Sequence, residues 1–97
     1  MSDAKITVEN INTPGRTEQV RADKYTEMRT ALMQVLPDAP PGLPFADIKD
    51  AAKPLLSQDL FPEGKTSGWW AKCVQLDLEA KGIIARTKGA PLKFYKT

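Results

Sequence analysis

The 97-residue chain contains no histidine and a single cysteine, Cys73. Histidine is the commonest general base and the commonest metal ligand, so its absence removes the usual routes to both kinds of site. One cysteine forms no internal disulfide, and a zinc site built from it and carboxylates would be unusual. We therefore expect no cofactor, no metal and no enzyme. The alternative is an enzyme that uses only Asp, Glu, Lys or Tyr.

Long hydrophobic runs are also missing from the chain. No apolar stretch approaches the roughly 20 residues that cross a bilayer. The N-terminus lacks the basic-then-apolar pattern of a secretory signal, which predicts a cytoplasmic protein with no membrane contact. With 41% hydrophobic and 27% charged residues, the composition is that of one small globular domain.

Acidic residues are scarce in the C-terminal third of the chain. Residues 64–97 carry seven basic and two acidic side chains, a net charge of +5, whereas residues 1–63 carry seven basic and ten acidic ones, a net charge of −3. A basic part joined to an acidic part indicates a surface that faces a polyanion. The alternative is that scattered lysines only keep a small domain in solution.

The first 21 residues predict an N-terminal extended arm. Apolar and polar side chains alternate over Lys5–Ile11, which is the period of a half-buried strand, and Asn12–Gly15 is typical of a turn. The segment Thr17–Ala22 either returns as a second strand or lies across the body. We assign residues 22–97 to a single domain.

The pattern over residues 22–56 predicts two helices separated by a proline-rich connection. The first has Asp23 as its N-cap and ends before Pro37, because the residue before a proline is pushed out of helical geometry. The second begins near Pro44, which suits a first helical turn, and is kinked or split at Pro54. The apolar faces consist of Tyr25, Met28, Leu32, Val35 and Leu36 in the first helix and of Phe45, Ile48, Ala52 and Leu55 in the second.

The strongest helical signal runs from Thr66 or Ser67, either of which is expected to cap it, to about Lys81. Gly82 ends this third helix, since glycine accepts left-handed geometry at a helix end. The apolar arc is wide, which predicts packing against two neighbours. It contains Trp69, Cys73, Leu76 and Ala80 on one side, extended by Trp70, Val74 and Leu78, and leaves a polar face of Lys72, Gln75 and Glu79.

Two short segments of strand composition follow, Ile83–Arg86 and Leu92–Tyr95. The five residues Thr87–Pro91 between them are short enough for a hairpin loop. The expected fold class is therefore α+β: a three-helix core followed by a C-terminal β-hairpin wing, with an N-terminal extended segment.

The segment Ser67–Arg86 resembles the third helix and first wing strand of the winged helix-turn-helix superfamily. The resemblance is carried by Leu78–Arg86, with its sequence Leu-Glu-Ala-Lys-Gly-Ile-Ile-Ala-Arg. The chain is also similar to a small bacterial family of unknown function with a Gly-Trp-Trp and Leu-Asp-Leu-Glu signature, here Gly68–Trp70 and Leu76–Glu79. The winged-helix resemblance covers residues 22–97 and is more specific for fold than for function, whereas membership of the small family would imply no activity.

The winged-helix resemblance implies that the third helix faces a DNA major groove and that the wing lies on the phosphate backbone. The alternative is that the hydroxyl groups at the start of the helix only cap it and the lysines only solvate it. The candidate nucleic-acid-binding residues are Lys65, Thr66, Ser67, Lys72, Gln75, Arg86, Lys88 and Lys93, with Lys96 as a further wing residue.

Three other residues of the third helix have predicted roles. Trp69 and Trp70 are about 100° apart, so one is expected in the core and the other at its edge, beneath the N-terminal segment or at a dimer surface. Stacking of a base on the second tryptophan is the less favoured alternative. Asp77 falls inside the apolar arc and is predicted to form a structural ion pair, with Arg86, Arg21 or backbone N–H groups as partners.

The leading hypothesis from the sequence is a DNA-binding winged-helix module, as a monomer or a homodimer. The second is a protein–protein interaction domain that docks through Trp69, Trp70 and the N-terminal segment. The third is an enzyme subunit or regulator with a small-molecule site, which no residue of the sequence specifically supports. Added salt separates the first two, because it weakens phosphate contacts far more than apolar ones.

Overall fold

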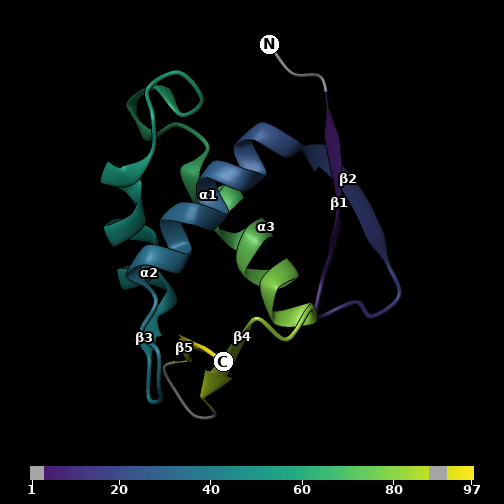
Figure 1. Ribbon diagram of the computed structural model, residues 1–97, viewed down its shortest axis with the longest axis vertical. Helices are drawn as coiled ribbons and strands as arrows, with labels where there is room; N and C mark the ends of the chain where they lie inside the picture. Colours follow the sequence, from purple (N-terminus) through teal and green to yellow (C-terminus); the bar gives the residue numbers. More distant parts are fainter. Residues whose placement is uncertain (1–3, 88–91) are drawn as a thin grey trace.

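A computed structural model describes residues 4–87 and 92–97 of the chain. It contains three α-helices and two small antiparallel sheets, and the second sheet includes a C-terminal hairpin (Figure 1). The predicted α+β class is confirmed at this level. The elements in chain order are β1 (Lys5–Glu9), β2 (Thr17–Arg21), α1 (Ala22–Val35), β3 (Leu43–Pro44), α2 (Phe45–Ala52), η1 (Lys53–Leu55), η2 (Pro62–Gly64), α3 (Ser67–Ala80), β4 (Ile84–Thr87) and β5 (Lys93–Lys96).

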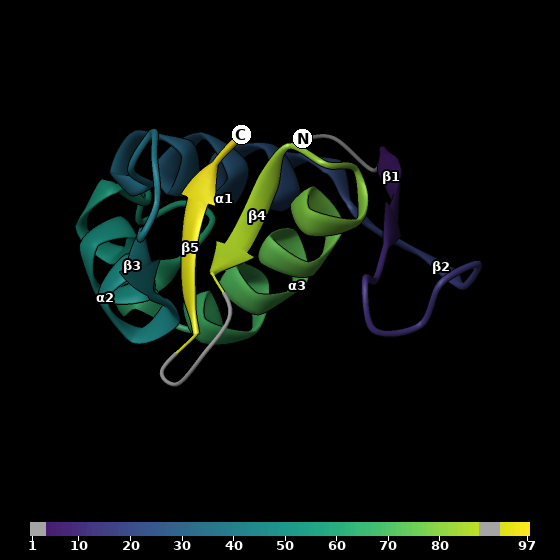
Figure 2. The same ribbon diagram turned by 90° about the horizontal axis from the view of Figure 1, so that it is seen from below.

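The N-terminal segment returns on itself as the hairpin β1–β2, which is one of the two predicted alternatives. Ile6 lies opposite Val20 and Val8 opposite Glu18, so these four side chains share one face of the two-stranded sheet. Val8 and Val20 are buried on this face. The hairpin lies beside α3 on the side away from α2, as Figures 1 and 2 both show.

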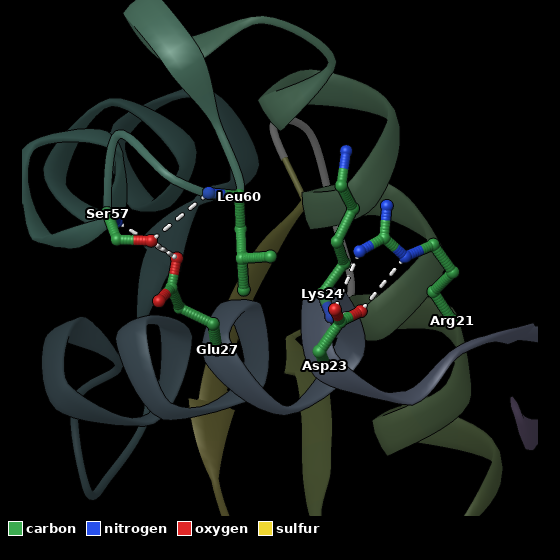
Figure 3. Close-up of polar contacts among 6 residues, drawn as sticks. All are labelled: Arg21, Asp23, Lys24, Glu27, Ser57 and Leu60. Atoms are coloured by element: carbon green, nitrogen blue, oxygen red, sulfur yellow. Dashed lines mark hydrogen bonds and ion pairs between the residues drawn. The ribbon is translucent and has the colours of Figure 1, made fainter. Parts of the chain in front are cut away.

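Helix α1 begins two residues earlier than predicted. Arg21 is still extended as the last residue of β2, so the helix starts directly at Ala22 and the expectation of Asp23 as N-cap is wrong. Asp23 instead lies in the first turn, where its carboxylate accepts hydrogen bonds from the Arg21 guanidinium and the Lys24 backbone N–H (Figure 3). The helix ends at Val35, before the extended Leu36, as Pro37 predicts.

The second predicted helix is divided at its proline. Helix α2 ends at Ala52 and the 3₁₀ turn η1 contains Pro54, which confirms the predicted split. The split turns Leu55 outward, where it is 47% exposed, so its predicted place on the buried face is wrong. Pro44 precedes the helix and belongs to β3, which the sequence analysis missed because the strand has only two residues.

Helix α3 runs from Ser67 to Ala80 between α1 and the C-terminal strands. It ends in a Schellman arrangement, in which the Gly82 N–H donates to Glu79 and the Ile83 N–H donates to Leu78. The prediction that Gly82 ends this helix is confirmed. The side chains that α3 buries are Ser67, Trp70, Ala71, Val74, Gln75, Asp77 and Leu78.

The second sheet has the strand order β3–β5–β4 and covers one end of the helices (Figure 2). Phe94 of β5 lies between Leu43 of β3 and Arg86 of β4 in the strand register, and its ring is buried. Gly42 has φ +88°, and a Cβ at this position would collide with the Phe94 carbonyl group. A side chain at residue 42 would therefore prevent β3 from reaching β5.

A single hydrophobic core joins the helices to both sheets. Glu27 of α1 fixes the chain beyond η1, because its carboxylate accepts from the Ser57 backbone N–H at 2.9 Å and from the Ser57 hydroxyl at 3.0 Å (Figure 3). Among the residues that the structure describes, no helix combines the length and apolar character needed to cross a membrane.

Candidate functional site

Phe45, the first residue of α2, brings a lysine of α3 close to a lysine of the C-terminal sheet. The Lys72 ammonium nitrogen lies 4.9 Å from the centroid of the Phe45 ring. Phe45 follows Pro44, whose partner in the β3–β5 register is Lys93. Lys72 and Lys93, which are distant in the sequence, thus both lie near the start of α2.

Two further lysines follow Phe45 along the side of α2 that faces α3. Lys49 lies one helical turn after Phe45, and its aliphatic chain passes Gly68, where an added Cβ would be 3.8 Å from its Cδ. Lys53 lies one turn further, and its chain packs directly against Gly64, the residue before Lys65. The absence of a side chain at Gly64 leaves room for the Lys53 chain, whereas a Cβ at Gly68 would make only an ordinary contact with Lys49.

We call the resulting group, Lys49, Lys53, Lys65, Lys72 and Lys93, the lysine surface. Within residues 4–87 and 92–97, none of these five ammonium groups has a carboxylate oxygen within 4.0 Å. Asp47 and Asp50 of α2 lie about 160° and about 100° around the helix from Lys49, away from this surface. The lysine surface therefore gathers five positive charges that form no ion pair within the described residues.

The loop that carries Lys65 has an unusual backbone. Glu63 has φ 57° and Thr66 has φ 61°, and these two residues flank Gly64 and Lys65. A β-branched or large residue in this region is strained, and such strain is concentrated at functional sites. Thr66 occupies the N-cap position of α3, but its hydroxyl donates to the Lys65 carbonyl at 2.6 Å and makes no cap to the helix.

The sequence-predicted binding residues fall into three groups. Lys65, Thr66 and Lys72 are exposed and Lys93 is partly exposed. Ser67 and Gln75 are buried, at 7% and 3% exposure, so the prediction of an exposed polar face containing Gln75 is wrong. The remaining two are Arg86, which is paired, and Lys88, which lies outside the described residues.

The polar face of α3 is turned inward because it meets β4. The Gln75 amide donates to the Glu79 carboxylate, which in turn accepts from Arg86 at 2.6 Å and 2.8 Å. This bidentate pair raises the pKa of the Arg86 guanidinium further above its ordinary value. Lys96 is likewise engaged, since its ammonium group donates to the Met33 carbonyl and pairs with Asp38.

The sequence analysis missed Lys49 and Lys53, although their spacing contained a signal. The two residues are four apart and follow Phe45 at the same interval, which places all three on one stripe of a helix. Asp47 and Asp50 fall off that stripe. An aromatic residue and two lysines at this spacing, separate from the acidic residues, mark a basic flank on α2.

A second feature, which we call the hairpin groove, lies between the β1–β2 hairpin and the outward side of α3. It has a volume of about 420 Å³. Lys72 belongs to both this groove and the lysine surface. The groove is lined by Val8, Glu9, Asn10, Thr13, Arg16 and Glu18 of the hairpin and by Trp69, Lys72, Cys73 and Leu76 of α3.

The two tryptophans separate as predicted, one in the core and one at its edge. Trp70 is 8% exposed, whereas Trp69 is 57% exposed and lines the groove beneath the hairpin. Their ring centroids are 5.1 Å apart and the ring planes meet at 79°, an edge-to-face contact. The buried indole therefore fixes the orientation of the exposed one.

Asp77 joins the hairpin to the helices from a fully buried position. Its carboxylate accepts from the Tyr25 hydroxyl of α1 and from the Glu9 backbone N–H of β1 at 2.8 Å. The Lys81 ammonium nitrogen lies 2.7 Å from Oδ1 and 2.8 Å from Oδ2. The predicted structural ion pair and backbone partner are confirmed, while Arg86 and Arg21, the predicted cationic partners, are wrong because each pairs with a carboxylate closer in the sequence.

Burial and the bond to Asp77 raise the pKa of the Tyr25 phenol well above its ordinary value, so Tyr25 acts here as a hydrogen-bond donor. Across the described part of the chain, no group of three or more Cys, Asp or Glu side chains is placed to hold a metal ion. The polar centre around Asp77 is thus a structural junction of α1, β1 and α3.

Comparison with known proteins places this arrangement in a family. Residues 5–94, which include the hairpin groove and the lysine surface, match the model of DUF6958, a family of unknown function. The chain belongs to this family. No curated protein and no solved structure matches it.

Proposed function

We propose that this chain is a nucleic-acid-binding module of the winged-helix type, which contacts the phosphates of DNA through its lysine surface. Support for the winged-helix assignment comes from the three helices, the C-terminal β4–β5 hairpin beside α3, and the addition of β3 to that hairpin. The hairpin then corresponds to the wing. The β1–β2 hairpin is an addition to that arrangement.

The observation that carries the proposal is the set of five unpaired lysines. Lys81 and Arg86 of the described chain are paired with carboxylates. Four other cations of this part of the chain, Lys5, Arg16, Lys24 and Arg29, also lack such a pair, but they are divided between the β1–β2 hairpin and α1 and do not gather around α2. A cluster without such partners raises the local concentration of an anion and favours a polyanion in particular. Five phosphate contacts correspond to a slope of log K against log salt of roughly −4 to −5 on duplex DNA.

In this proposal α3 does not act as the base-reading helix that the sequence predicted. Gln75 lies beneath β4 and Arg86 is held by Glu79, so neither side chain is available to base edges in this conformation. The exposed part of α3 is its first turns, with Lys65, Thr66 and Lys72. We therefore assign phosphate contacts to the lysine surface and leave direct reading of duplex sequence as a minor role.

The experiment is a titration with mixed-sequence duplex DNA at about 50 and about 200 mM salt. The test variant carries Lys49→Gln, Lys53→Gln and Lys72→Gln. The matched control carries Lys5→Gln, Lys24→Gln and Arg29→Gln, which removes the same charge from elsewhere on the molecule. We expect salt-sensitive binding by the wild type and the control, and affinity at least about 30-fold lower for the test variant, since each lost phosphate contact lowers both K and its salt slope.

Two results would overturn the proposal. Equal losses in the two variants would mean that net charge alone, and not the lysine surface, attracts the DNA. An absence of binding at low salt by the folded wild-type protein would exclude nucleic-acid binding by this chain.

A second candidate, a protein-docking domain, is favoured by one observation. Trp69 is 57% exposed at the hairpin groove, and tryptophan is among the side chains that most often anchor protein interfaces. Such docking, including formation of a homodimer, would depend little on salt. Size-exclusion chromatography of wild type and Trp69→Ser at both salt concentrations tests the homodimer.

A further inference from the structure

We infer that the hairpin groove receives an unpaired nucleobase of a nucleic acid whose phosphates lie on the lysine surface. The inference rests on the proposed function and specifies its ligand as single-stranded or tailed nucleic acid. It follows from four properties of the groove: its position, its aromatic wall, its balance of charge and its hydrogen-bonding groups.

The position of the groove excludes a duplex from most of α3. Trp69, Lys72, Cys73 and Leu76 are spaced at intervals of three and four, so they form the outward stripe of the helix. In a winged-helix module this stripe would face the major groove, but here the β1–β2 hairpin lies alongside it. The space of about 420 Å³ between the two suits a small planar group and is far too narrow for a double helix.

Trp69 provides a wall on which a base can stack. More than half of its surface is exposed, and the contact with buried Trp70 holds its ring in one orientation. Stacking on an exposed aromatic side chain is the main attraction in sequence-tolerant binding of single strands. Three further lining residues of the groove are uncharged. Val8 and Leu76 are apolar, and Cys73 stays a neutral thiol because burial raises its pKa to about 11.

The distribution of charge suits the base of the ligand to the hairpin groove and its phosphates to the lysine surface. In the groove, Arg16 and Lys72 are balanced by Glu9 and Glu18, so the lining has no net charge and suits a neutral base. The lysine surface has no such balance and suits phosphates. Lys72 belongs to both, so the two sites adjoin one another.

Glu18 gives the groove a preference among bases. It lies opposite Val8 in the hairpin and on the same face, and its charge contributes to the raised pKa of the Cys73 thiol, so its carboxylate faces the groove. A carboxylate only accepts hydrogen bonds, and cytosine offers an exocyclic amino group where thymine offers a carbonyl oxygen. The groove should therefore favour cytosine over thymine.

The test compares a blunt duplex with the same duplex carrying a short single-stranded tail of either cytosine or thymine, in the full-length protein. We expect the cytosine tail to bind more tightly than the blunt end by about 10-fold, and to quench tryptophan fluorescence. Trp69→Leu should abolish this gain and leave blunt-duplex affinity within about two-fold of wild type, while Trp69→Phe keeps an aromatic wall and should retain most of it. Leu55→Ala, an exposed apolar residue remote from the groove, is the matched control.

The preference for cytosine is tested with Glu18→Gln, because the glutamine amide both donates and accepts hydrogen bonds. We expect this variant to lose the preference for the cytosine tail while still binding tails. A preference that is unchanged in Glu18→Gln would overturn the role of Glu18 in base recognition.

Three outcomes would overturn the inference in ways that differ from failure of the proposed function. Blunt and tailed duplexes that bind equally, with dependence on the lysine surface intact, would leave the function standing and exclude a base from the groove. Tail binding that Trp69→Leu leaves unchanged would do the same. Free cytidine monophosphate that binds as tightly as the tailed duplex would show that the groove serves a free nucleotide.

Discussion

At the scale of single residues, Asp77 shows how a charge can be buried without a functional role. Its two oxygens meet three donors, the Tyr25 hydroxyl, the Glu9 N–H and the Lys81 ammonium group, which come from three different elements. A buried carboxylate with this many partners is compensated for the hydration that it has lost. Lys81 is only four residues from Asp77 in the sequence, whereas the tertiary fold brings Tyr25 and Glu9 to it.

We predict that Asp77→Asn lowers the free energy of unfolding by about 2 to 3 kcal/mol, because the amide leaves at least one buried donor without an acceptor. Urea denaturation followed by circular dichroism measures the change. Asp38→Asn is the control: Asp38 also pairs with a lysine, at 3.0 Å, but its side chain is 89% exposed and the stability should hardly change. Equal effects of the two substitutions would contradict the buried role of Asp77.

Cys73 carries a pH dependence with a defined sign. Burial raises the pKa of its thiol from 9.0 to about 11, with the charges of Asp77 and Glu18 adding to the effect. The folded state therefore keeps the proton while the unfolded chain loses it, so this contribution to stability is complete below pH 9 and lost as the pH approaches 11.

The corresponding prediction concerns alkylation of the folded protein by iodoacetamide, which reacts with the thiolate. We expect the rate to remain low at pH 9 and to rise towards pH 11, whereas the urea-unfolded chain should already react rapidly near pH 9. A folded-state rate that reaches half its maximum at or below pH 9 would show that the Cys73 thiol is not shielded in this way.

At the scale of elements, the shortest strand controls how the C-terminal sheet meets the helices. β3 pairs with β5 through only Leu43 and Pro44, and it brings Lys93 next to the start of α2. Gly42 makes this pairing possible, because its backbone at φ +88° passes directly against the Phe94 carbonyl. The position of Lys93 in the lysine surface thus depends on a residue with no side chain.

Gly42→Ala should lower the free energy of unfolding by about 2 to 4 kcal/mol, since it combines positive-φ strain with a backbone collision. Gly15→Ala is a matched control, because Gly15 has φ +87° but nothing within 4 Å of an added Cβ. Strain alone should cost that variant about 1 kcal/mol. Thermal unfolding of the two proteins compares them, and equal losses would mean that the contact with Phe94 is unimportant.

The sequence was sufficient to predict most elements, and the reasons are local. Pro37, Pro54 and Gly82 each end or interrupt a helix through their own backbone chemistry, and each did so where predicted. The two-residue strand β3 escaped prediction because no period can be read from two residues.

Which side of α3 faces the core could not be predicted from the sequence, for a different reason. Its apolar arc is so wide that either flank could face the core, and the choice depends on partners far along the chain. Arg86 of β4 draws Glu79 and Gln75 inward, which leaves Trp69 exposed on the opposite flank. The hairpin groove was predicted only in part: a tryptophan at the core edge beneath the N-terminal segment was one of the alternatives, but the remaining lining depends on how the β1–β2 hairpin folds back on α3.

At the scale of the whole molecule, the β1–β2 hairpin is attached less firmly than the rest. Among the described residues, it supplies Val8 and Val20 to the buried core, with Ile6 packed against it, and its polar links include the Glu9 N–H to Asp77 and the ion pair of Arg21 with Asp23. Segments with few buried apolar contacts open at a lower free energy than the global transition. We therefore expect the wall of the groove to open more readily than the three-helix core.

We predict that amide protons in β1 and β2 exchange through local opening, at a free energy below that of global unfolding, while those of α1 and α3 exchange only globally. Val20→Ala should accelerate exchange in the hairpin and leave the helices almost unchanged, whereas Val74→Ala in α3 should accelerate exchange everywhere, because Val74 is fully buried. Native-state hydrogen exchange by NMR measures both. Equal protection throughout the chain would contradict separate opening of the hairpin.

The junction at Asp77 also constrains how this sequence can change over time. A relative that replaced Asp77 with an apolar residue would strand the Tyr25 hydroxyl in the core, and a phenylalanine at position 25 would then restore the fit. The Lys81 position would be released from its partner, while the Glu9 backbone would need a new anchor that no single substitution supplies. Asp77 and Tyr25 should therefore be inherited or exchanged together, and the docked hairpin should be inherited with them.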